Sequence, residues 1–268
     1  MPSAPPAAPP AVPPMVLTFA ASDPTGGAGL QADLLTLAAL GCHPLSVVTA
    51  LTVQDTRGVE RVLPMQPAWI TEQARCVLAD IEVAAFKAGV LGSAQNVRAV
   101  SELVAEHAAV PFVVDPVLAS GRGDPLAEED AIEALRELIL PRTTMLTPNS
   151  LEARRLADGA SDLAECARRL VDQGCEYVLI TGTHEAGADV VNTLYDESGV
   201  VREDRWPRLP ERYHGSGCTL ASAIAARLAQ GLEPPEAARE AQQFTWEALA
   251  AGFRPGAGQF LPHRSFRR

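Results

Sequence analysis

Residues 16–40, VLTFAASDPTGGAGLQADLLTLAAL, decide the fold class of this chain. The apolar run at 16–20 predicts a buried strand, and Asp23, Pro24 and the glycines at 26 and 27 predict a loop after it. Leucines at 30, 34, 37 and 40 recur at helical spacing, which predicts a helix over 28–40 that ends before Gly41. A strand, a glycine-rich loop and a helix in this order are typical of α/β proteins.

The same alternation of strand and helix continues along the chain. Strands are expected at 46–51, 85–91, 112–114, 144–146 and 177–180, and helices at 69–81, 94–107, 129–140, 150–156, 163–173, 218–230 and 235–251. Apolar runs at 190–195 and 200–206, joined by a turn, indicate a β-hairpin. Because the other strands are continuous apolar runs, we expect a mainly parallel sheet covered by helices on both faces, in one domain over 15–260.

Length, charge and cysteine content exclude several classes of protein. The chain has 268 residues, of which 47% are hydrophobic, as in globular proteins. Its 22 basic and 33 acidic side chains give a net charge of −11, which argues against a nucleic-acid partner. No apolar run reaches the ~18 residues of a membrane span, so no membrane partner is expected. Five widely spaced cysteines without a CxxC pair predict neither a disulfide framework nor a zinc ribbon, and favour a reducing, cytoplasmic location.

The two ends of the chain differ from the expected domain. Residues 1–14 are rich in Pro and Ala and predict a disordered leader. The segment after Gly252, which ends in a basic tail at 261–268, is expected to be a solvated end or a subunit contact and not part of a site.

The loop at 22–33 is the first candidate for chemistry, since ligands of such sheets bind at the carboxyl ends of the strands. Gly27, Gly29 and Ala32 match the GxGxxA pattern of dinucleotide-binding proteins, and Asp55 is placed to act as the ribose acid. An NAD(P)-dependent oxidoreductase is therefore one alternative. Asp33 argues against it, because a helix that receives only pyrophosphate would not carry a carboxylate one turn in.

A second candidate is Gly215-Ser216-Gly217-Cys218, which begins an Ala-rich helix. Free amides and the positive end of the helix dipole make such a start a cradle for a phosphoryl group. A thiol there is expected to have a pKa below ~8.5, so that Cys218 could act as a general base. A glycine turn that only caps a buried helix remains the alternative.

Carboxylates at two further strand ends form the third candidate. Asp115 follows the strand at 112–114, and Glu152 follows the strand at 144–146. Two such carboxylates on one edge of a sheet can hold Mg²⁺ through water. Alternatively, Asp115 is a turn residue and Glu152 matches the dipole of its own helix.

Six motifs in order carry a family resemblance. They are residues 22–33 (SDPTGGAGLQAD), 49–56 (TALTVQDT), 86–93 (FKAGVLGS), 113–117 (VVDPV), 147–153 (TPNSLEA) and 214–220 (HGSGCTL). Together they resemble the hydroxymethylpyrimidine/phosphomethylpyrimidine kinases of thiamine biosynthesis, which belong to the ribokinase-like superfamily. The resemblance covers about residues 16–252 and implies a three-layer αβα fold and a homodimer.

The resemblance also implies a reaction and a set of site residues. ATP with Mg²⁺, and optionally a monovalent cation, would phosphorylate 4-amino-5-hydroxymethyl-2-methylpyrimidine and then its monophosphate. The implied residues are Ala28, Asp33, Thr52, Gln54 and Val90 for the pyrimidine; Gly215, Ser216 and Gly217 for the anion hole, with Cys218 as base; Asp115, Asn149 and Glu152 for metal and phosphate; and Thr181, Gly182 and Thr183 for the nucleotide.

Four positions depart from the family pattern. Thr181 replaces a usual lysine, Val90 a usual methionine and Ala21 a usual glycine, and Asn192 stands where an aspartate is frequent. The neutral Thr181 puts phosphate neutralisation by this strand in doubt, which raises the alternative of a catalytically inactive ligand sensor. A pyridoxal kinase, with the same fold and chemistry, is another alternative.

Overall fold

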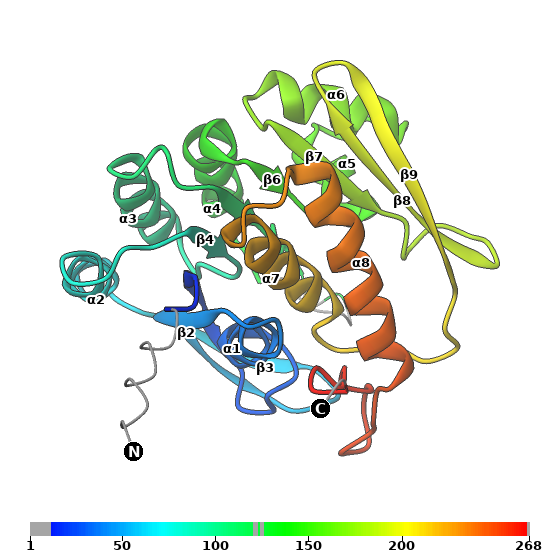
Figure 1. Ribbon diagram of the computed structural model, residues 1–268, viewed down its shortest axis with the longest axis horizontal. Coiled ribbons are helices and arrows are strands. Elements are labelled where there is room, and N and C mark those ends of the chain that lie inside the picture. The colour runs from blue at the N-terminus through cyan, green and yellow to red at the C-terminus, as the bar shows by residue number, and fades with distance from the viewer. Residues whose placement is uncertain (1–11, 120–122, 124–125, 267–268) are drawn as a thin grey trace, which may run out of the picture.

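The computed structural model describes residues 12–119, 123 and 126–266 (Figure 1). Most of the leader expected at 1–14, and the last two residues of the basic tail, lie outside the described residues. Within the part of the chain that is described, no helix combines the length and the apolar character that crossing a membrane requires.

A nine-stranded sheet runs through the described chain in the order β3-β2-β1-β4-β5-β6-β7-β8-β9. Its strands are β1 (Met15–Ser22), β2 (His43–Gln54), β3 (Val59–Pro64), β4 (Ala85–Ala88), β5 (Phe112–Val114), β6 (Met145–Leu146), β7 (Tyr177–Thr181), β8 (Asp189–Asp196) and β9 (Gly199–Pro207). The strands from β2 to β7 in this order are parallel. β3 at one edge and the β8–β9 hairpin at the other are antiparallel to their neighbours, so the predicted mainly parallel sheet with a late hairpin is confirmed.

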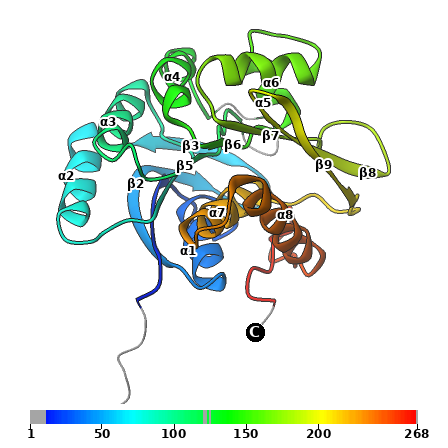
Figure 2. The same cartoon turned by 45° about the horizontal axis from the view of Figure 1, so that its top comes forward.

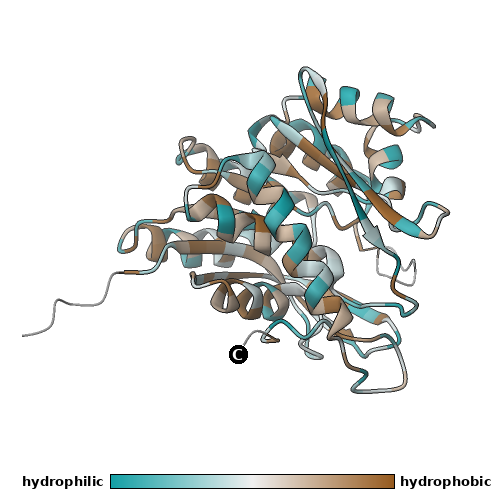
Figure 3. Ribbon diagram, turned by 45° about the vertical axis from the view of Figure 1, so that its right-hand side comes forward, coloured by the Kyte–Doolittle hydropathy of each residue, from teal (hydrophilic) through white to brown (hydrophobic). Residues whose placement is uncertain are grey.

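Helices cover both faces of this sheet, as the three-layer prediction requires. They are α1 (Gly29–Ala39), α2 (Pro67–Leu78), α3 (Ala94–Ala105), α4 (Glu129–Ala134), α5 (Ser150–Leu156), α6 (Leu163–Asp172), α7 (Ser216–Ala229) and α8 (Pro234–Ala250). Figure 2 shows α1, α7 and α8 on one side of the strands and α2 to α6 on the other. In Figure 3 the central strands are mostly hydrophobic, whereas the helices carry both hydrophobic and hydrophilic residues.

The two cores differ in side-chain size. The core under α2 to α6 contains bulky residues such as Phe19, Phe86 and Phe112. The core under α1, α7 and α8 is rich in alanine, for example Ala221, Ala225 and Ala238. Small side chains let α7 approach both α8 and the sheet closely, which brings the first turn of α7 to the ends of the central strands.

Strand order positions the candidate loops. The chain passes from β1 to β2 on one side, and β4 then pairs with the other side of β1. Such a reversal leaves a crevice outside the carboxyl end of the strand where it occurs. The loop that follows β1, which includes Asp23 and the first glycines, lies at this point.

Three local features differ from the sequence predictions. β3 was not predicted, because Glu60 and Arg61 interrupt its apolar pattern, as is common in exposed edge strands. The strand expected at 85–91 ends at Ala88. The helix expected at 129–140 is α-helical only to Ala134 and continues as a π-helical turn at Leu135–Ile139 and a 3-10 turn at Leu140–Arg142.

The prediction of a solvated C-terminal tail holds for residues 253–257, which are exposed, but is wrong for most of residues 258–266. Leu261 and Arg264 are each 4% exposed. Phe253 pairs with Leu261, and Tyr213 pairs with Phe260, through isolated β-bridges. The segment after α8 therefore folds back over the loop that precedes α7.

Candidate active site

Two glycine loops meet at the carboxyl edge of the sheet. The first joins β1 to α1, and the second precedes α7. Gly215 has a φ of +83°, and a Cβ atom built on it would lie 1.8 Å from the carbonyl oxygen of Gly27. Only glycine fits at this crossing, because any side chain at 215 would push the loops apart. The structure thus brings together the first two candidates from the sequence.

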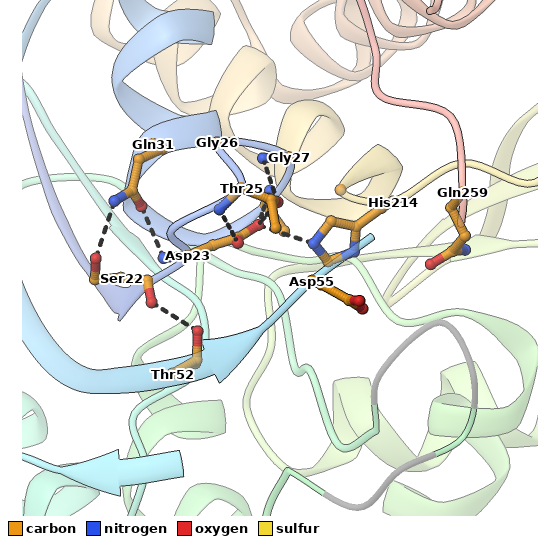
Figure 4. Close-up of polar contacts among 12 residues, drawn as sticks. Ser22, Asp23, Thr25, Gly26, Gly27, Gln31, Thr52, Asp55, His214 and Gln259 are labelled. Carbon is orange, nitrogen blue, oxygen red and sulfur yellow. Dashed lines mark hydrogen bonds and ion pairs between the residues drawn. The ribbon is translucent and has the colours of Figure 1, made fainter. Parts of the chain in front are cut away.

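Asp23 organises this junction. Its carboxylate accepts hydrogen bonds from the backbone N–H groups of Thr25 at 2.8 Å and Ala28 at 2.7 Å, and pairs with His214 Nε2 at 2.8 Å (Figure 4). Burial raises the pKa of Asp23, but the bond to His214 and the backbone bonds outweigh burial and hold this pKa below its usual range. Since the amide of Ala28 is already bonded, the start of α1 does not offer it to a pyrophosphate, which weakens the oxidoreductase alternative.

The ends of β1 and β2 are tied together beside this loop. Thr52 Oγ1 donates to the Ser22 carbonyl at 2.9 Å, and Gln31 Nε2 donates to Ser22 Oγ at 2.9 Å (Figure 4). Side chains two apart on a strand share a face, so Gln54 and Thr52 lie on the same side of β2. Both are half-buried, as is Ala28, so none of the three side chains is sealed in the core.

A buried ion pair lies beneath the first loop. Lys87 Nζ lies 3.0 Å from both carboxylate oxygens of Asp33, which also accepts a hydrogen bond from Ser222 Oγ at 2.7 Å. Both side chains of the ion pair are fully buried. Burial alone would lower the pKa of Lys87, but Asp33 raises it, so the lysine stays charged. Asp33, predicted as a pyrimidine contact, is therefore occupied by protein groups in this structure.

Sequence reasoning gave Lys87 no role, although the sequence carried a signal. Lys87 is the charged residue of the otherwise apolar strand β4, whose four residues are all buried. A charge in such a strand requires a buried partner. The partner was not identifiable from the sequence, because Asp33 lies on a different element more than fifty residues away.

The predicted low pKa of Cys218 is wrong. Burial raises the pKa of this thiol to about 12, and the carboxylates of Asp115 and Asp33 raise it further. Lys87 and the backbone N–H of Gly29 act in the opposite direction without offsetting the burial. In the free protein Cys218 is a thiol at neutral pH, since two helix N-termini do not compensate for a desolvated anion beside two carboxylates.

Asp115 lies directly opposite the anion-hole candidate. A Cβ atom built on Gly217 would be 3.5 Å from each carboxylate oxygen of Asp115. Burial raises the pKa of Asp115 to about 6, while Lys87 and a hydrogen bond with Cys218 lower it. The structure therefore gathers Asp33, Lys87, Asp115, Gly217 and Cys218 around the first turn of α7.

Asn149 and Glu152 form a capping box at the start of α5. Asn149 Oδ1 accepts from the backbone N–H groups of Leu151 at 2.9 Å and Glu152 at 3.0 Å, and Glu152 Oε2 accepts from the Asn149 N–H at 3.0 Å. Burial and then repulsion by Asp115 raise the pKa of Glu152 to about 8. The capping bonds leave the amide nitrogen of Asn149, and not its oxygen, as the group suited to a phosphate.

Asp115 and Glu152 together suit a cation that takes only a few of its ligands from the protein. Among the side chains and backbone that the structure describes, Asp115 Oδ2 is buried without a hydrogen-bond partner, and the two carboxyl groups repel each other. Among the described residues, no group of three or more His, Cys, Asp or Glu side chains is arranged to enclose a metal ion. This donor set fits Mg²⁺ that completes its shell with water and phosphate oxygens.

The residues predicted for the nucleotide lie at the end of β7. Thr181 is bridged to Asn149 and donates its N–H to the Pro148 carbonyl at 2.9 Å, so it adjoins the capping box. Gly182 is buried and donates its N–H to Asn192 Oδ1 at 3.1 Å, while Thr183 is exposed. Asn192, at the position noted as a departure, thus binds the loop backbone.

Arg208 holds the rest of this loop. Its guanidinium donates to the backbone carbonyls of Thr183 at 2.9 Å, Glu185 at 2.8 Å, Gly187 at 2.9 Å and Asp189 at 3.3 Å. Hydrogen bonds from the Arg208 side chain to backbone carbonyls therefore hold the loop at 181–189. Sequence reasoning missed Arg208 because nothing in the pattern around it distinguishes it from a surface arginine.

Val90 lies apart from the other pyrimidine candidates, beyond the end of β4. Its carbonyl oxygen accepts a hydrogen bond from Thr49 Oγ1 at 2.5 Å. Its side chain lines a small apolar pocket with Gly89, Leu118 and Ile132. This pocket borders the crevice on the side of β5.

Comparison with known proteins agrees with this geometry. The model of the phosphomethylpyrimidine kinase family matches residues 23–263. A hydroxymethylpyrimidine/phosphomethylpyrimidine kinase from Streptomyces coelicolor is 45% identical over 252 residues, covering 91% of both chains.

Two solved structures are similar as well. A phosphomethylpyrimidine kinase from Clostridium difficile has a TM-score of 0.76 at 32% identity, covering 88% of this chain and 99% of its own. A pyridoxal kinase from Staphylococcus aureus, in complex with AMP-PCP and pyridoxal, has a TM-score of 0.87 at 29% identity, covering 96% of each chain. From the family model and these identities, the chain belongs to the phosphomethylpyrimidine kinase family.

Proposed function

We propose that the protein transfers a phosphoryl group from ATP to the hydroxymethyl group of 4-amino-5-hydroxymethyl-2-methylpyrimidine, and then phosphorylates the monophosphate, in thiamine biosynthesis. The observation that carries this proposal is the meeting of the two glycine loops beside Asp115 and Cys218. There a Cβ atom built on Gly217, in the first turn of α7, would lie 3.5 Å from each carboxylate oxygen of the buried Asp115. Amides and a helix dipole at this point suit a phosphoryl group whose charge spreads in the transition state.

The pyrimidine would bind at the acceptor end of the site, which we define as the β1–α1 loop, the ends of β2 and β4 and the first turn of α7. The Gln54 amide offers one donor and one acceptor, which match a ring nitrogen and its neighbouring amino group. Ala28 and Thr52 would line the pocket beside it, and Val90 would contact the ring as well. Asp33 would act through Lys87, with which it is paired.

Cys218 would accept the hydroxyl proton of the substrate. As a thiol of pKa about 12 it is a poor base in the free protein, and part of that elevation comes from the charge of Asp115. Lys87 lowers the pKa of Cys218 and would stabilise negative charge on the sulfur. The base function therefore depends on the charge state of Asp115.

Asp115 and Glu152 would hold Mg²⁺, with Asn149 donating its amide to a phosphate. When bound there, Mg²⁺ would neutralise these carboxylates and the phosphate oxygens of ATP. Neutralising Asp115 removes a cause of the high pKa of Cys218. A monovalent cation is a further proposal without a defined site.

ATP would extend toward the nucleotide end of the site, which we define as residues 181–189 with β8 and β9. Thr181, Gly182 and Thr183 offer hydroxyl and backbone groups but no charge. Positive charge for the phosphates would come from Mg²⁺ and from the acceptor end.

Phosphorylation of pyridoxal is the second candidate activity. It is favoured by the similarity to the pyridoxal kinase from Staphylococcus aureus, whose ring substrate also carries a primary alcohol. The crevice edge formed by Thr52 and Gln54 is suited to either heteroaromatic ring.

An assay of the purified protein with ATP and Mg²⁺ tests these proposals. Each alcohol is supplied separately and the phosphorylated products are separated by chromatography. We expect the pyrimidine to yield mono- and diphosphate. Turnover of pyridoxal alone would replace the first activity by the second, and turnover of neither alcohol would favour a ligand sensor.

We also propose a cytoplasmic homodimer. All five cysteines are free thiols, as a reducing compartment maintains them. Leu51, Val53 and Leu63 are 46%, 45% and 63% exposed on the adjacent strands β2 and β3, and a second copy would cover this apolar face. Sedimentation equilibrium should give twice the mass of one chain for the wild type. Leu63→Glu should lower the measured mass to that of one chain. A wild type with the mass of a monomer would reject the dimer.

A further inference from the structure

Arg264 is a buried arginine at the end of the chain, and its contacts lie in the active site. It is 4% exposed. One terminal nitrogen donates to the Gly27 carbonyl at 2.5 Å and to the Gly215 carbonyl at 3.4 Å, so a single group joins the two glycine loops. Its other nitrogens donate to the Gly26 carbonyl at 3.3 Å and to Thr219 Oγ1 at 3.0 Å.

The segment that carries Arg264 is itself fixed to the edge of the site. The N–H of Gln259 donates to the Thr56 carbonyl at 2.8 Å, and its side chain donates to the Tyr213 carbonyl at 3.3 Å. The N–H of His214 donates to the Phe260 carbonyl at 2.9 Å. The chain end thus reaches the loops after β1 and β2 and the loop before α7.

The partners of Arg264 in the described part of the chain are three carbonyl oxygens and one hydroxyl, and no carboxylate is among them. A guanidinium so placed satisfies acceptors on both loops and brings an uncompensated charge behind the first turn of α7. Burial lowers the pKa of Arg264, whereas Cys218, Asp33 and Asp23 act in the opposite direction. The arginine remains charged.

The C=O and the N–H of one peptide unit point in opposite directions, because the unit is planar. A contact that fixes the C=O therefore also fixes the N–H. Because Arg264 binds the carbonyls of Gly27 and Gly215, it restrains the peptide units that these carbonyls share with the N–H groups of Ala28 and Ser216. The first of these N–H groups is also held by Asp23 at 2.7 Å. These two glycines also cross at van der Waals limits, so a small shift of one loop displaces the other. The fork geometry of arginine suits this task, since its other nitrogens add bonds to the Gly26 carbonyl and to Thr219 Oγ1 that a single lysine ammonium cannot make at the same time.

We propose that Arg264 is a positioning residue for phosphoryl transfer, which sets the β1–α1 loop and the anion-hole loop in register with each other. This inference rests on the proposed kinase function. It assigns a role in the site to a C-terminal segment whose sequence suggested only a solvated tail.

The test compares Arg264→Ala, Arg264→Lys and the control Arg254→Ala with the wild type. Arg254 lies on the same segment, is exposed, and bonds only to carbonyls within that segment. We expect kcat to fall about 10- to 100-fold in Arg264→Ala, as for misplaced reacting groups, while the KM for the pyrimidine changes less. Millimolar guanidinium ion should restore part of the kcat of Arg264→Ala, and Arg264→Lys should remain impaired.

Hydrogen exchange supplies a readout that does not need activity. In both Arg264 variants, peptides that contain residues 26–29 and 215–218 should exchange faster than in the wild type, with little change in the peptides of β5 and β6. Unchanged exchange in these two loops, or full kcat in Arg264→Lys, would overturn the positioning role. If the wild type itself shows no kinase activity, the proposed function fails, and exchange in Arg264→Lys still decides whether Arg264 positions the loops.

Discussion

At the acceptor end of the site, charged side chains are buried and paired, whereas the nucleotide end is held mainly by hydrogen bonds to its own backbone. Asp33 and Lys87 have no exposed surface, and Asp115 and Cys218 adjoin them. At the other end, Arg208 and Asn192 bind backbone groups of residues 182–189, and Thr181 carries no charge.

This difference indicates where the protein fixes its geometry before ligands arrive. Buried charges hold only one arrangement, because any other leaves a desolvated ion without a partner. A loop held by backbone bonds on the surface tolerates change at small cost. Substitutions at the acceptor end should therefore affect folding and turnover, and those at the nucleotide end should affect ATP binding.

The largest effect is expected for Lys87→Met, which removes a fully buried charge at the acceptor end. It leaves Asp33 without a counter-ion and should lower the free energy of unfolding by about 3–5 kcal/mol, measured by urea denaturation. The double variant Asp33→Asn/Lys87→Met should recover most of that loss, since neither charge is then unpaired. A loss below about 1 kcal/mol in Lys87→Met would contradict the importance of the pair.

Cys218→Ala should lower kcat by roughly 100-fold or more, the usual contribution of a general base, with pyrimidine binding largely retained. Steady-state kinetics and a calorimetric titration measure the two quantities. Cys76→Ala is the matched control, because Cys76 is exposed on α2. If kcat in Cys218→Ala equals that of the wild type, Cys218 is not the base.

Gln54→Ala should raise the dissociation constant of the pyrimidine about 10-fold, because the two hydrogen bonds of its amide exist before the reaction begins. The change in kcat should be smaller. Gln243→Ala serves as control, since Gln243 is exposed on α8 and its side chain donates to Glu247 at 3.0 Å. Equal pyrimidine affinity in Gln54→Ala and Gln243→Ala would remove Gln54 from the binding site.

Arg208→Ala tests how the loop at the nucleotide end contributes to ATP binding. Loosening the loop at 183–189 should raise the KM for ATP by about threefold and leave the KM for the pyrimidine unchanged. Arg75→Ala is the control, because Arg75 is exposed on α2 and pairs with Glu106, outside the nucleotide end. A fall in kcat at saturating ATP, instead of a rise in KM, would indicate that this loop shapes the reacting end.

A change of pH is the mildest perturbation of the comparison, since it needs no substitution. Burial raises the pKa of Glu152 from 4.5 to about 8, so the folded protein keeps a proton that the unfolded chain has released. Without Mg²⁺, stability should therefore fall as pH rises from about 4.5 to about 8, which appears as a falling Tm.

Glu152→Gln, which cannot ionise, should flatten this slope, as should saturating Mg²⁺ in the wild type. Calorimetry at four or more pH values measures it. A slope of the same size in Glu152→Gln would assign the effect to other groups, with Asp115 the first to test because its pKa is about 6.

Local patterns were sufficient for much of the fold. The alternation of apolar strands and helices gave the mainly parallel sheet, and the turn at 196–199 gave the hairpin. Local patterns failed where the environment decides: the exposed edge strand β3 reads as a polar segment, and the π-helical turn after α4 has no sequence signal of its own.

The candidate site divides in the same way. Glycines and strand-end carboxylates are local features, so the sequence by itself determined residues 22–33, 115, 149–152 and 215–218 as candidates for the chemistry. The family resemblance implied a pyrimidine contact for Asp33, and the fold shows that this side chain is paired with Lys87.

Only the tertiary structure decided the protonation states and the charge partners in the site. The pKa of Cys218 rises to about 12 because burial and two carboxylates outweigh the helix N-termini, and a helix start in the sequence shows only the latter. Likewise, Arg264 becomes part of the site because the chain end folds over both glycine loops. A sequence records which groups are present, but burial and long-range contacts determine their charge and their partners.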